Sequence, residues 1–551
     1  IQTEQNILSI SQFNAIINNE IQSQPAPFIY ERLGEKYRHF FIDEFQDTSE
    51  MQWHNLTPLI DNALSGQDES GAQGSLMIVG DPKQSIYRWR GGKAEQFIAL
   101  SKEENPFSNP DKETKFLDTN YRSFEQVITF NNDFFNHVSN EFQQVDYKNL
   151  YENESAQKIN SKLGGYVEIQ FIPEVNKDDD EITKDVLYLT ATLTTINDVI
   201  SQGFEYKDIA LLTRKRKDGV LLANFLTENN IPILSSETLL INNATEVKLV
   251  LNVLKFIKNN RDDESKAQML YFIAKHKQNI LPLHDFISEG MKHRSEEHFQ
   301  KWLNDFGIAI DFGFARKNSL YVTTEYIIDL FIKDKKTLSY VQYFMDLVLE
   351  RTVKLQSSIS DFLNYWEDNF EKLSIPSPEN TNAVKMMTIH KSKGLEFPVV
   401  IFPFAEEDYS RSRDKIWVEI EGFDDLNIPK ALIDLNKNVR EYGVKAQEIF
   451  DIKKQEDLLD NINVLYVALT RAEEQLYIIS NKKINAKGDL ANNMSSLFVS
   501  FLQNLHLFSE EENHYPFGNK IRISEKKILT EEQIEAESPK QIIAVESAID
   551  K

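Results

Sequence analysis

No cysteine occurs among the 551 residues of the chain. This absence excludes disulfide bonds, thiolate nucleophiles, and the zinc and iron–sulfur sites that depend on cysteine ligands. Long apolar runs are also missing, since stretches such as 399–402 (VVIF) are far shorter than the roughly 20 residues of a membrane-spanning helix. No signal-peptide pattern opens the chain. Together these absences favour a cytoplasmic protein without a membrane partner.

Positive charge is scarce as well. Lysine and arginine number 61 against 86 acidic residues, which gives a formal net charge of −25. This balance argues against a protein that coats DNA over its whole surface, because a DNA-binding surface is usually basic. Binding depends on the local patch, however, so a motor that grips a few nucleotides in a groove is compatible with this charge.

The length of the chain is too great for one ordinary domain and predicts three or four. Short apolar runs closed by polar residues alternate with helical segments, which is typical of α/β folds with parallel sheets. Between 244 and 379 the apolar residues recur at helical spacing, which predicts a mainly helical insertion. We expect strands at 38–42, 76–79, 166–172, 209–212, 384–388, 398–402 and 476–479.

Two adjacent acids close the first of these apolar runs. Residues 41–48 read FIDEFQDT, with Asp43 and Glu44 at the expected strand end. One carboxylate in this position can hold Mg²⁺, and the next can polarise an attacking water as a general base. The alternative is a solvated acidic pair that caps the N-terminus of a helix. The pair alone does not decide between these two interpretations.

A second polar segment follows the next expected strand. Residues 79–92 read VGDPKQSIYRWRGG. Gln84 lies just past the strand end, where an amide can sense a γ-phosphate or the attacking water. Tyr87, Trp89 and Arg90 add aromatic faces and a guanidinium, on which a base can stack for about 1–3 kcal/mol. The alternative is a surface turn with an aromatic anchor in the core.

These two segments resemble motifs II and III of the UvrD/Rep-type superfamily 1 DNA helicases, and three further segments follow in the family's order. Residues 117–123 (LDTNYRS) are similar to motif IV, 388–397 (TIHKSKGLEF) to motif V, and 465–472 (LYVALTRA) to motif VI. The segments 27–33 and 88–97 resemble the RecB/AddA branch of the family, the exodeoxyribonuclease V beta type.

The resemblance implies a role for each matched residue. Asp43 would serve Mg²⁺, Glu44 the attacking water, and Gln84 the coupling of the γ-phosphate to the DNA. The other nucleotide-facing residues would be Tyr121 near the adenine, Arg122 at the γ-phosphate, Gly394, Glu396 at the ribose, and Arg471 as the second arginine finger. Those facing DNA would be Tyr87, Trp89, Arg90, Thr388 and His390. A surface ion pair is the alternative for either arginine, and simple exposure is the alternative for His390.

The resemblance also implies two RecA-like P-loop NTPase lobes, with ATP between them. The expected boundaries are an incomplete first lobe at 1–116 with motifs II and III, a second lobe at 117–243 and 381–481 with motifs IV to VI, a helical insertion at 244–380, and a C-terminal extension or linker at 482–551.

A P-loop is missing from this set. It needs the pattern G-x-x-x-x-G-K-[ST], whose amides cradle phosphates, and no segment matches, since alanine follows the lysine in 91–94 (GGKA). In the family the P-loop lies far upstream of motif II, and here only 42 residues precede Asp43. We therefore expect an N-terminally truncated chain that is inactive alone. RecB/AddA-type chains often carry a nuclease after the motor, and we interpret 482–551 as the linker towards one.

The implied activity is that of an ATP- and Mg²⁺-dependent DNA helicase that moves 3′-to-5′ on single-stranded DNA. Its context would be a helicase–nuclease in double-strand break repair and recombination. Its partners would be single-stranded and duplex DNA and a RecC/AddB-like subunit. The alternative is a DNA-binding scaffold subunit that descends from a helicase and does not hydrolyse ATP. Such decay should remove the acids and arginine fingers first, and Asp43, Glu44, Gln84, Arg122 and Arg471 all remain.

Overall fold

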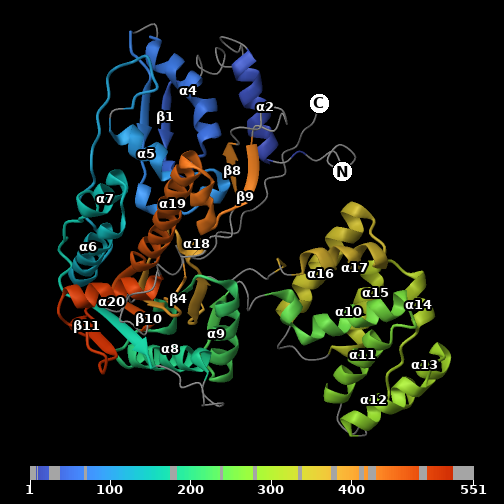
Figure 1. Cartoon of the computed structure of the whole chain (residues 1–551). Coiled ribbons are helices and arrows are strands. Elements are labelled where there is room, and N and C mark those ends of the chain that lie inside the picture. Colours follow the sequence, from blue (N-terminus) through green and yellow to red (C-terminus); the bar gives the residue numbers. More distant parts are fainter. Residues whose placement is uncertain are drawn as a thin grey trace.

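The described part of the chain forms three bodies, each with its own apolar core (Figure 1). We call them the small-sheet body, the large-sheet body and the helical body. A computed structural model of the chain describes residues 8, 10–23, 37–67, 71–102, 104–173, 183–235, 240–276, 282–332, 338–370, 372–373, 381–408, 415–419, 430–482 and 493–524.

The small-sheet body is built on two parallel strands, β1 (His39–Ile42) and β2 (Ser75–Ile78). Alternate residues of the strands, such as Phe40 and Leu76, pack with Trp53 and its neighbours. Phe41 and Met77 lie on the opposite face and are exposed. Its helices are α2 (Ile10–Ser23), α4 (Glu50–Ser65) and α5 (Ala94–Ser101), and its short 3-10 turns are η1 (Phe45–Asp47), η2 (Pro82–Gln84) and η3 (Arg88–Arg90).

The large-sheet body contains a seven-stranded sheet in the order β11-β3-β10-β7-β4-β6-β5. All pairings are parallel except that of β11 with β3. Helices cover both faces, so the central strands are buried on both sides and read as continuous apolar runs. The strands are β3 (Tyr166–Ile172), β4 (Ile209–Thr213), β5 (Ile233–Ser235), β6 (Val384–Thr388), β7 (Phe397–Phe402), β10 (Ala472–Asn481) and β11 (His514–Gly518).

The helices of this body divide between the two faces of the sheet. One core joins the sheet to α6 (Glu125–Val138), α7 (Val145–Glu152), α19 (Val444–Leu469) and α20 (Met494–Asn504). The other joins it to α8 (Lys184–Ser201) and α9 (Arg216–Glu228). The short α18 (Ile389–Ser392) directly follows β6. A small antiparallel hairpin, β8 (Lys415–Glu419) and β9 (Lys430–Asp434), packs on the first half of α19 together with η9 (Lys437–Tyr442).

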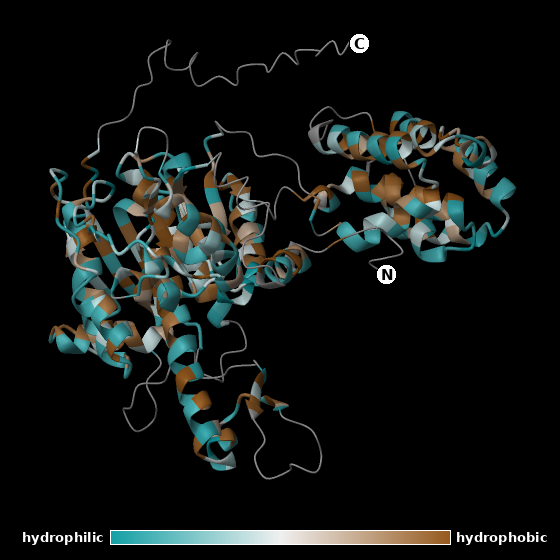
Figure 2. Ribbon diagram, turned by 90° about the horizontal axis from the view of Figure 1, so that it is seen from above, coloured by the Kyte–Doolittle hydropathy of each residue, from teal (hydrophilic) through white to brown (hydrophobic). Residues whose placement is uncertain are grey.

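The helical body contains the helices predicted between 244 and 379. Their apolar faces meet in one core, and hydrophobic segments gather inside this body as they do inside the others (Figure 2). The helices are α10 (Thr245–Lys258), α11 (Asp263–His276), α12 (Leu283–Lys292), α13 (Glu296–Asp305), α14 (Phe312–Lys317), α15 (Leu320–Phe331), α16 (Leu338–Leu355) and α17 (Ile359–Asn369). None of the helices in the described ranges is both long and apolar enough to cross a membrane.

The segment predicted to be a C-terminal extension or linker differs from that expectation over its described part. There α20 packs into the core of the large-sheet body, and β11 adds an edge strand to the sheet. The sequence of β11 contains Pro516, which does not read as a strand but is tolerated at a sheet edge. The remainder of the predicted linker, 483–492 and 525–551, lies outside the described residues.

Candidate nucleotide and DNA site

The predicted site residues lie at the carboxyl ends of parallel strands or beside them. Asp43 and Glu44 follow β1, and Gln84 belongs to the turn that follows β2. Thr388 ends β6 and begins α18, which contains His390. In open α/β sheets this edge is where ligands bind, because the turns between strand and helix lie there.

Glu44 has a left-handed backbone conformation, with φ of 51° and ψ of 40°. This conformation is unusual for a residue with a side chain, and such strain is found most often at functional sites. Its amide donates to Asp43 Oδ1 at 2.8 Å, and Gln46 Nε2 donates to Glu44 Oε2 at 2.6 Å. Glu44 precedes η1, yet its side chain makes no capping hydrogen bond. The alternative interpretation, a helix-capping pair, is therefore not supported for Glu44.

A lysine of the large-sheet body reaches this acidic segment. Lys393 Nζ lies 2.7 Å from each carboxylate oxygen of Asp47 and 3.4 Å from Glu44 Oε2. The lysine side chain is only 7% exposed. Burial raises the pKa of Asp47, although the ion pair with Lys393 opposes the shift. The two bodies are thus joined by an ion pair beside Glu44, the residue predicted to act on the attacking water.

Gln84 lies in a tightly bonded turn. Asp81 accepts from the amide of Lys83 at 3.0 Å and from Gln84 Nε2 at 3.2 Å, and it forms an ion pair with Lys83 at 2.9 Å. Burial alone would raise the pKa of Asp81, but the charge and hydrogen bonds of Lys83 and Gln84 outweigh it and lower this pKa. Gln46 Oε1 accepts from the Asp81 amide at 3.0 Å, so one glutamine connects this turn to Glu44.

The large-sheet residues that were predicted to face the nucleotide include one ion pair. Arg122 Nε donates to Glu396 Oε2 at 2.7 Å, and both side chains are partly exposed. This geometry matches the surface ion pair that was the alternative for Arg122. Tyr121 is 77% exposed and available for stacking. Gly394 has a φ of +81° with open space beside it, a backbone conformation that favours glycine.

Arg471 does not form a surface ion pair. It is 1% exposed, and its guanidinium donates to Val467 O at 2.9 Å, Leu395 O at 3.2 Å and Thr470 Oγ1 at 3.0 Å. Burial, reinforced by the positive charge of Arg122, lowers the pKa of Arg471 to about 10. A buried guanidinium whose charge is disfavoured fits a site that receives an anion.

The residues predicted to face DNA lie together. Tyr87 donates from its hydroxyl to His390 O at 3.1 Å, and their rings are 5.9 Å apart. The Arg90 guanidinium lies 4.5 Å from the Trp89 ring and 5.3 Å from the Tyr87 ring. Trp89 is 70% exposed, so it is not a core anchor, whereas Tyr87 packs against the core. Thr388 lies at the start of α18, beside His390.

His390 is half-buried rather than exposed. Arg214 Nη1 lies 3.4 Å from both ring nitrogens, so the guanidinium covers the ring. Burial, together with the charges of Arg214 and Arg90, lowers the pKa of His390. The imidazole is therefore neutral at pH 7.

Sequence reasoning missed Arg214 and Lys393 as members of the site. Arg214 directly follows the buried strand β4, so its position at a strand end was a signal. Lys393 lies inside the segment that resembles motif V. Its partner, Asp47, is 346 positions away, so the ion pair depends on the tertiary fold.

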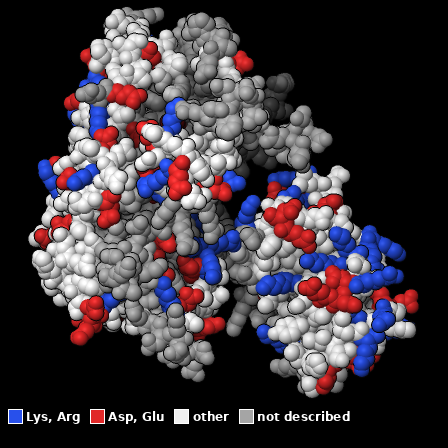
Figure 3. All heavy atoms as spheres, viewed as in Figure 1, with Lys and Arg blue, Asp and Glu red and all other residues white. Residues whose placement is uncertain are grey.

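Charge is mixed over the visible surface. On the face drawn in Figure 3, acidic and basic side chains alternate and do not merge into one continuous basic surface. This mixed distribution on the visible face agrees with the acidic net charge of −25.

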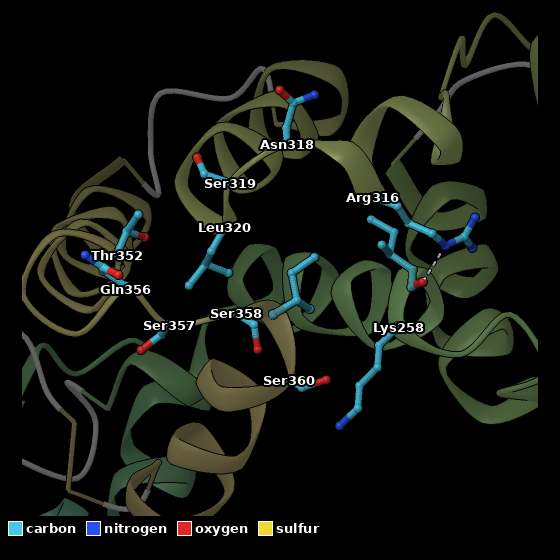
Figure 4. A pocket seen from close by; sticks show the side chains of 12 residues that line it. Lys258, Arg316, Asn318, Ser319, Leu320, Thr352, Gln356, Ser357, Ser358 and Ser360 are labelled. Atoms are coloured by element: carbon cyan, nitrogen blue, oxygen red, sulfur yellow. Dashed lines mark hydrogen bonds between the residues drawn. The ribbon is translucent and has the colours of Figure 1, made fainter.

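One hollow lies away from these residues, in the helical body (Figure 4). It has a volume of about 610 Å³. Arg316 lines it but is bonded to Ile257 O at 2.8 Å and to Glu296. None of the predicted site residues lines this hollow, so it does not mark the candidate nucleotide or DNA site.

Two family models cover most of the chain. The UvrD-like helicase C-terminal domain matches residues 116–483, and the UvrD/REP helicase N-terminal domain matches residues 2–105. The chain belongs to the UvrD-like helicase family. The resemblance seen in the ordered motifs is thereby confirmed.

Curated relatives of this UvrD-like chain are named as the A subunit of an ATP-dependent helicase/nuclease. The protein from Natranaerobius thermophilus is 25% identical, over 88% of this chain and 42% of its own length. Those from Staphylococcus epidermidis and Pediococcus pentosaceus are 24% and 26% identical, over 87% and 85% of this chain. The chain spans less than half the length of these relatives, 42% and 41% in the latter two.

Proposed function

We propose that this chain is the larger part of an ATP-driven DNA helicase motor, in which the small-sheet and large-sheet bodies are RecA-like lobes. The main supporting observation is the meeting of opposite charges where the bodies join. Glu44 and Asp47 come from the small-sheet body, and Lys393 and Arg471 come from the large-sheet body. Such an arrangement suits a nucleotide whose hydrolysis changes the contact between two lobes.

The residues present fit a magnesium nucleotide. The nearby charges of Arg122 and Arg471 disfavour each other, and a polyphosphate would relieve this repulsion. Bound Mg²⁺ would supply charge neutralisation at the phosphates, with Asp43 as its protein ligand. Glu44 would hold the attacking water and Gln84 would sense it. Tyr121, Gly394 and Glu396 would line the base and ribose. Arg122 and Arg471 would neutralise the charge that develops on the phosphate.

Single-stranded DNA would lie over Tyr87, Trp89, Arg90, Thr388 and His390. Exposed aromatic faces beside a guanidinium bind bases without sequence preference. We propose the family's 3′-to-5′ movement along this strand and a role in double-strand break repair in the cytoplasm. The relatives' name, which describes one subunit of a helicase/nuclease, favours an AddB-like partner for the full protein.

The proposal has two direct tests. The chain has no P-loop pattern, so the purified 551-residue protein should hydrolyse ATP at no more than background rate, with or without DNA. Robust DNA-stimulated hydrolysis would show that the phosphates are held by another segment. In a longer polypeptide that includes a P-loop, Glu44→Gln should retain ATP and DNA binding but lose most of its turnover, by about 10²-fold or more. Turnover near that of the wild type would exclude Glu44 as the base.

The scaffold alternative is less well supported. A chain that had lost hydrolysis would be free to relax the strained backbone at Glu44 and the buried charge of Arg471, and both remain.

A further inference from the structure

One buried asparagine of the large-sheet body holds the turn that contains Gln84. Asn463 lies on α19 and is fully buried. Its Nδ2 donates to Pro82 O at 3.1 Å and to Ser85 O at 2.9 Å, and its Oδ1 accepts from Tyr151 at 2.5 Å. Both amide hydrogens are used on the two carbonyls that flank Gln84, and the tyrosine of α7 fixes the orientation of the amide.

The same face of α19 also binds the C-terminal end of the segment 82–90, which contains Gln84. Asp460, one helical turn before Asn463, accepts from Arg88 Nε at 2.9 Å on both carboxylate oxygens. Arg88 also donates to Glu95 of α5 at 2.7 Å and 3.1 Å, and Tyr147 donates to the same glutamate. Residues three apart on a helix lie on one face, so one side of α19 bonds both ends of the 82–90 segment.

Helix α5 extends this connection, because its two faces belong to different cores. Ala94 and Ile98 pack in the core of the large-sheet body, with α6 and α19. Phe97 and Leu100 pack in the core of the small-sheet body, with Trp53. Residues 82–98 therefore contact both bodies, through hydrogen bonds to α19 and through the packing of α5.

We infer that Asn463 is a positioning residue, which keeps Gln84 and the exposed side chains of Trp89 and Arg90 in a fixed relation to the large-sheet body. Asp460 supports it through Arg88. A change in the contact between the bodies would then reach Gln84 and the DNA-facing side chains together. The inference rests on the proposed function only for the DNA contacts, since the connection itself is independent of any ligand.

Hydrogen exchange of the 551-residue protein tests the connection without a ligand. Asn463→Asp keeps the size of the side chain and its acceptor, but loses the donors and sets a carboxylate against two carbonyls. We expect amides in 82–92 to exchange at least about tenfold faster, while those of β7 and β10 exchange as in the wild type. Tyr151→Phe removes only the orienting bond and should give a smaller change in the same segment.

Asn461→Asp is the matched control, because Asn461 lies on the same helix and bonds only within it, to Asp457 O at 2.7 Å. It should leave exchange in 82–92 unchanged. Binding of an oligothymidylate measures the consequence: Asn463→Asp should weaken it about fivefold or more, and Asn461→Asp should not.

Unchanged exchange in 82–92 in both Asn463→Asp and Tyr151→Phe would overturn the inference. Equal acceleration in β7 and β10 would also overturn it, because that result marks a purely structural role. If Asn463→Asp does not fold, Tyr151→Phe decides by the same criteria. If the wild-type protein binds no oligothymidylate, the proposed function fails, while the exchange result still decides the role of Asn463.

Discussion

Lys393 and Asp47 form a partly buried ion pair between the two bodies, with the lysine Nζ 2.7 Å from each carboxylate oxygen. The pair lies beside Glu44, whose Oε2 is 3.4 Å from the same nitrogen. A cation supplied by one body thus contacts the acids of the other. This contact would be lost or rearranged whenever the two bodies separate.

The ion pair between Lys393 and Asp47 should stabilise the folded protein beyond the separate contributions of the two side chains. A double-mutant cycle with Lys393→Met and Asp47→Asn should give a coupling free energy of about 1–3 kcal/mol, because the lysine side chain is only 7% exposed and its charge is therefore poorly hydrated. The measurement is chemical denaturation of the four proteins. Strictly additive effects would mean that the ion pair contributes nothing to stability.

His390 should make stability depend on pH. Burial and the charges of Arg214 and Arg90 lower its pKa, so the unfolded chain takes up the proton first as the pH falls. The stability that neutral His390 contributes is fully present above the pKa of the unfolded chain, about 6.5. It is lost as the pH falls from there to the pKa of the folded protein. His390→Gln should therefore flatten the dependence of the unfolding free energy on pH just below about 6.5. An unchanged slope would contradict the lowered pKa.

Arg90 and His390 should affect DNA binding differently. Arg90 is charged, so if it contacts a phosphate, Arg90→Ala should lower the slope of log K against log salt by about 0.7 for single-stranded DNA. His390 is neutral at pH 7, so His390→Gln should weaken binding without changing the slope. Arg440→Ala is a control for loss of an arginine, because Arg440 pairs with Asp451 outside the site. Equal slopes for all three variants would rule out a phosphate contact by Arg90.

Replacement of Arg471 should lower the stability of the protein only slightly, although the side chain is buried. Its hydrogen bonds to Val467 and Leu395 favour the folded state, but the burial of its charge beside Arg122 opposes it. We expect Arg471→Met to lower the unfolding free energy by only about 1–2 kcal/mol, since relief of the buried charge offsets part of the cost of leaving the carbonyls of Val467 and Leu395 without their donor. A loss of more than about 3 kcal/mol would indicate that Arg471 is mainly structural.

Much of the large sheet could be predicted because its central strands are buried on both faces. The run from Ile209 to Thr213 is buried throughout, and its apolar sequence reads directly as a central strand. The helices of the helical body follow from apolar spacing in the same way. Strand β11 could not be predicted, because it is a short edge strand with Pro516 in it, and its pairing depends on β3.

The position of the candidate residues at strand ends could be predicted from the sequence, but their contacts could not. Asp43, Glu44 and Gln84 follow apolar runs, so their place at strand ends was readable from the sequence. The bond from Asn463 to Pro82 joins residues 381 positions apart, and only the packing of α19 brings them together. An asparagine within a buried helix gives no local signal of such a role.

Single-stranded DNA should bind over Tyr87, Trp89 and Arg90 if the chain is part of a helicase motor. Titration of the 551-residue protein with a fluorescent oligothymidylate at low salt is the decisive measurement. We expect saturable binding that weakens by about tenfold or more when Trp89→Ala and Arg90→Ala are combined, because a stacking face and a cation are both lost. Absence of binding by the wild-type protein, or equal binding by the double variant, would contradict this assignment.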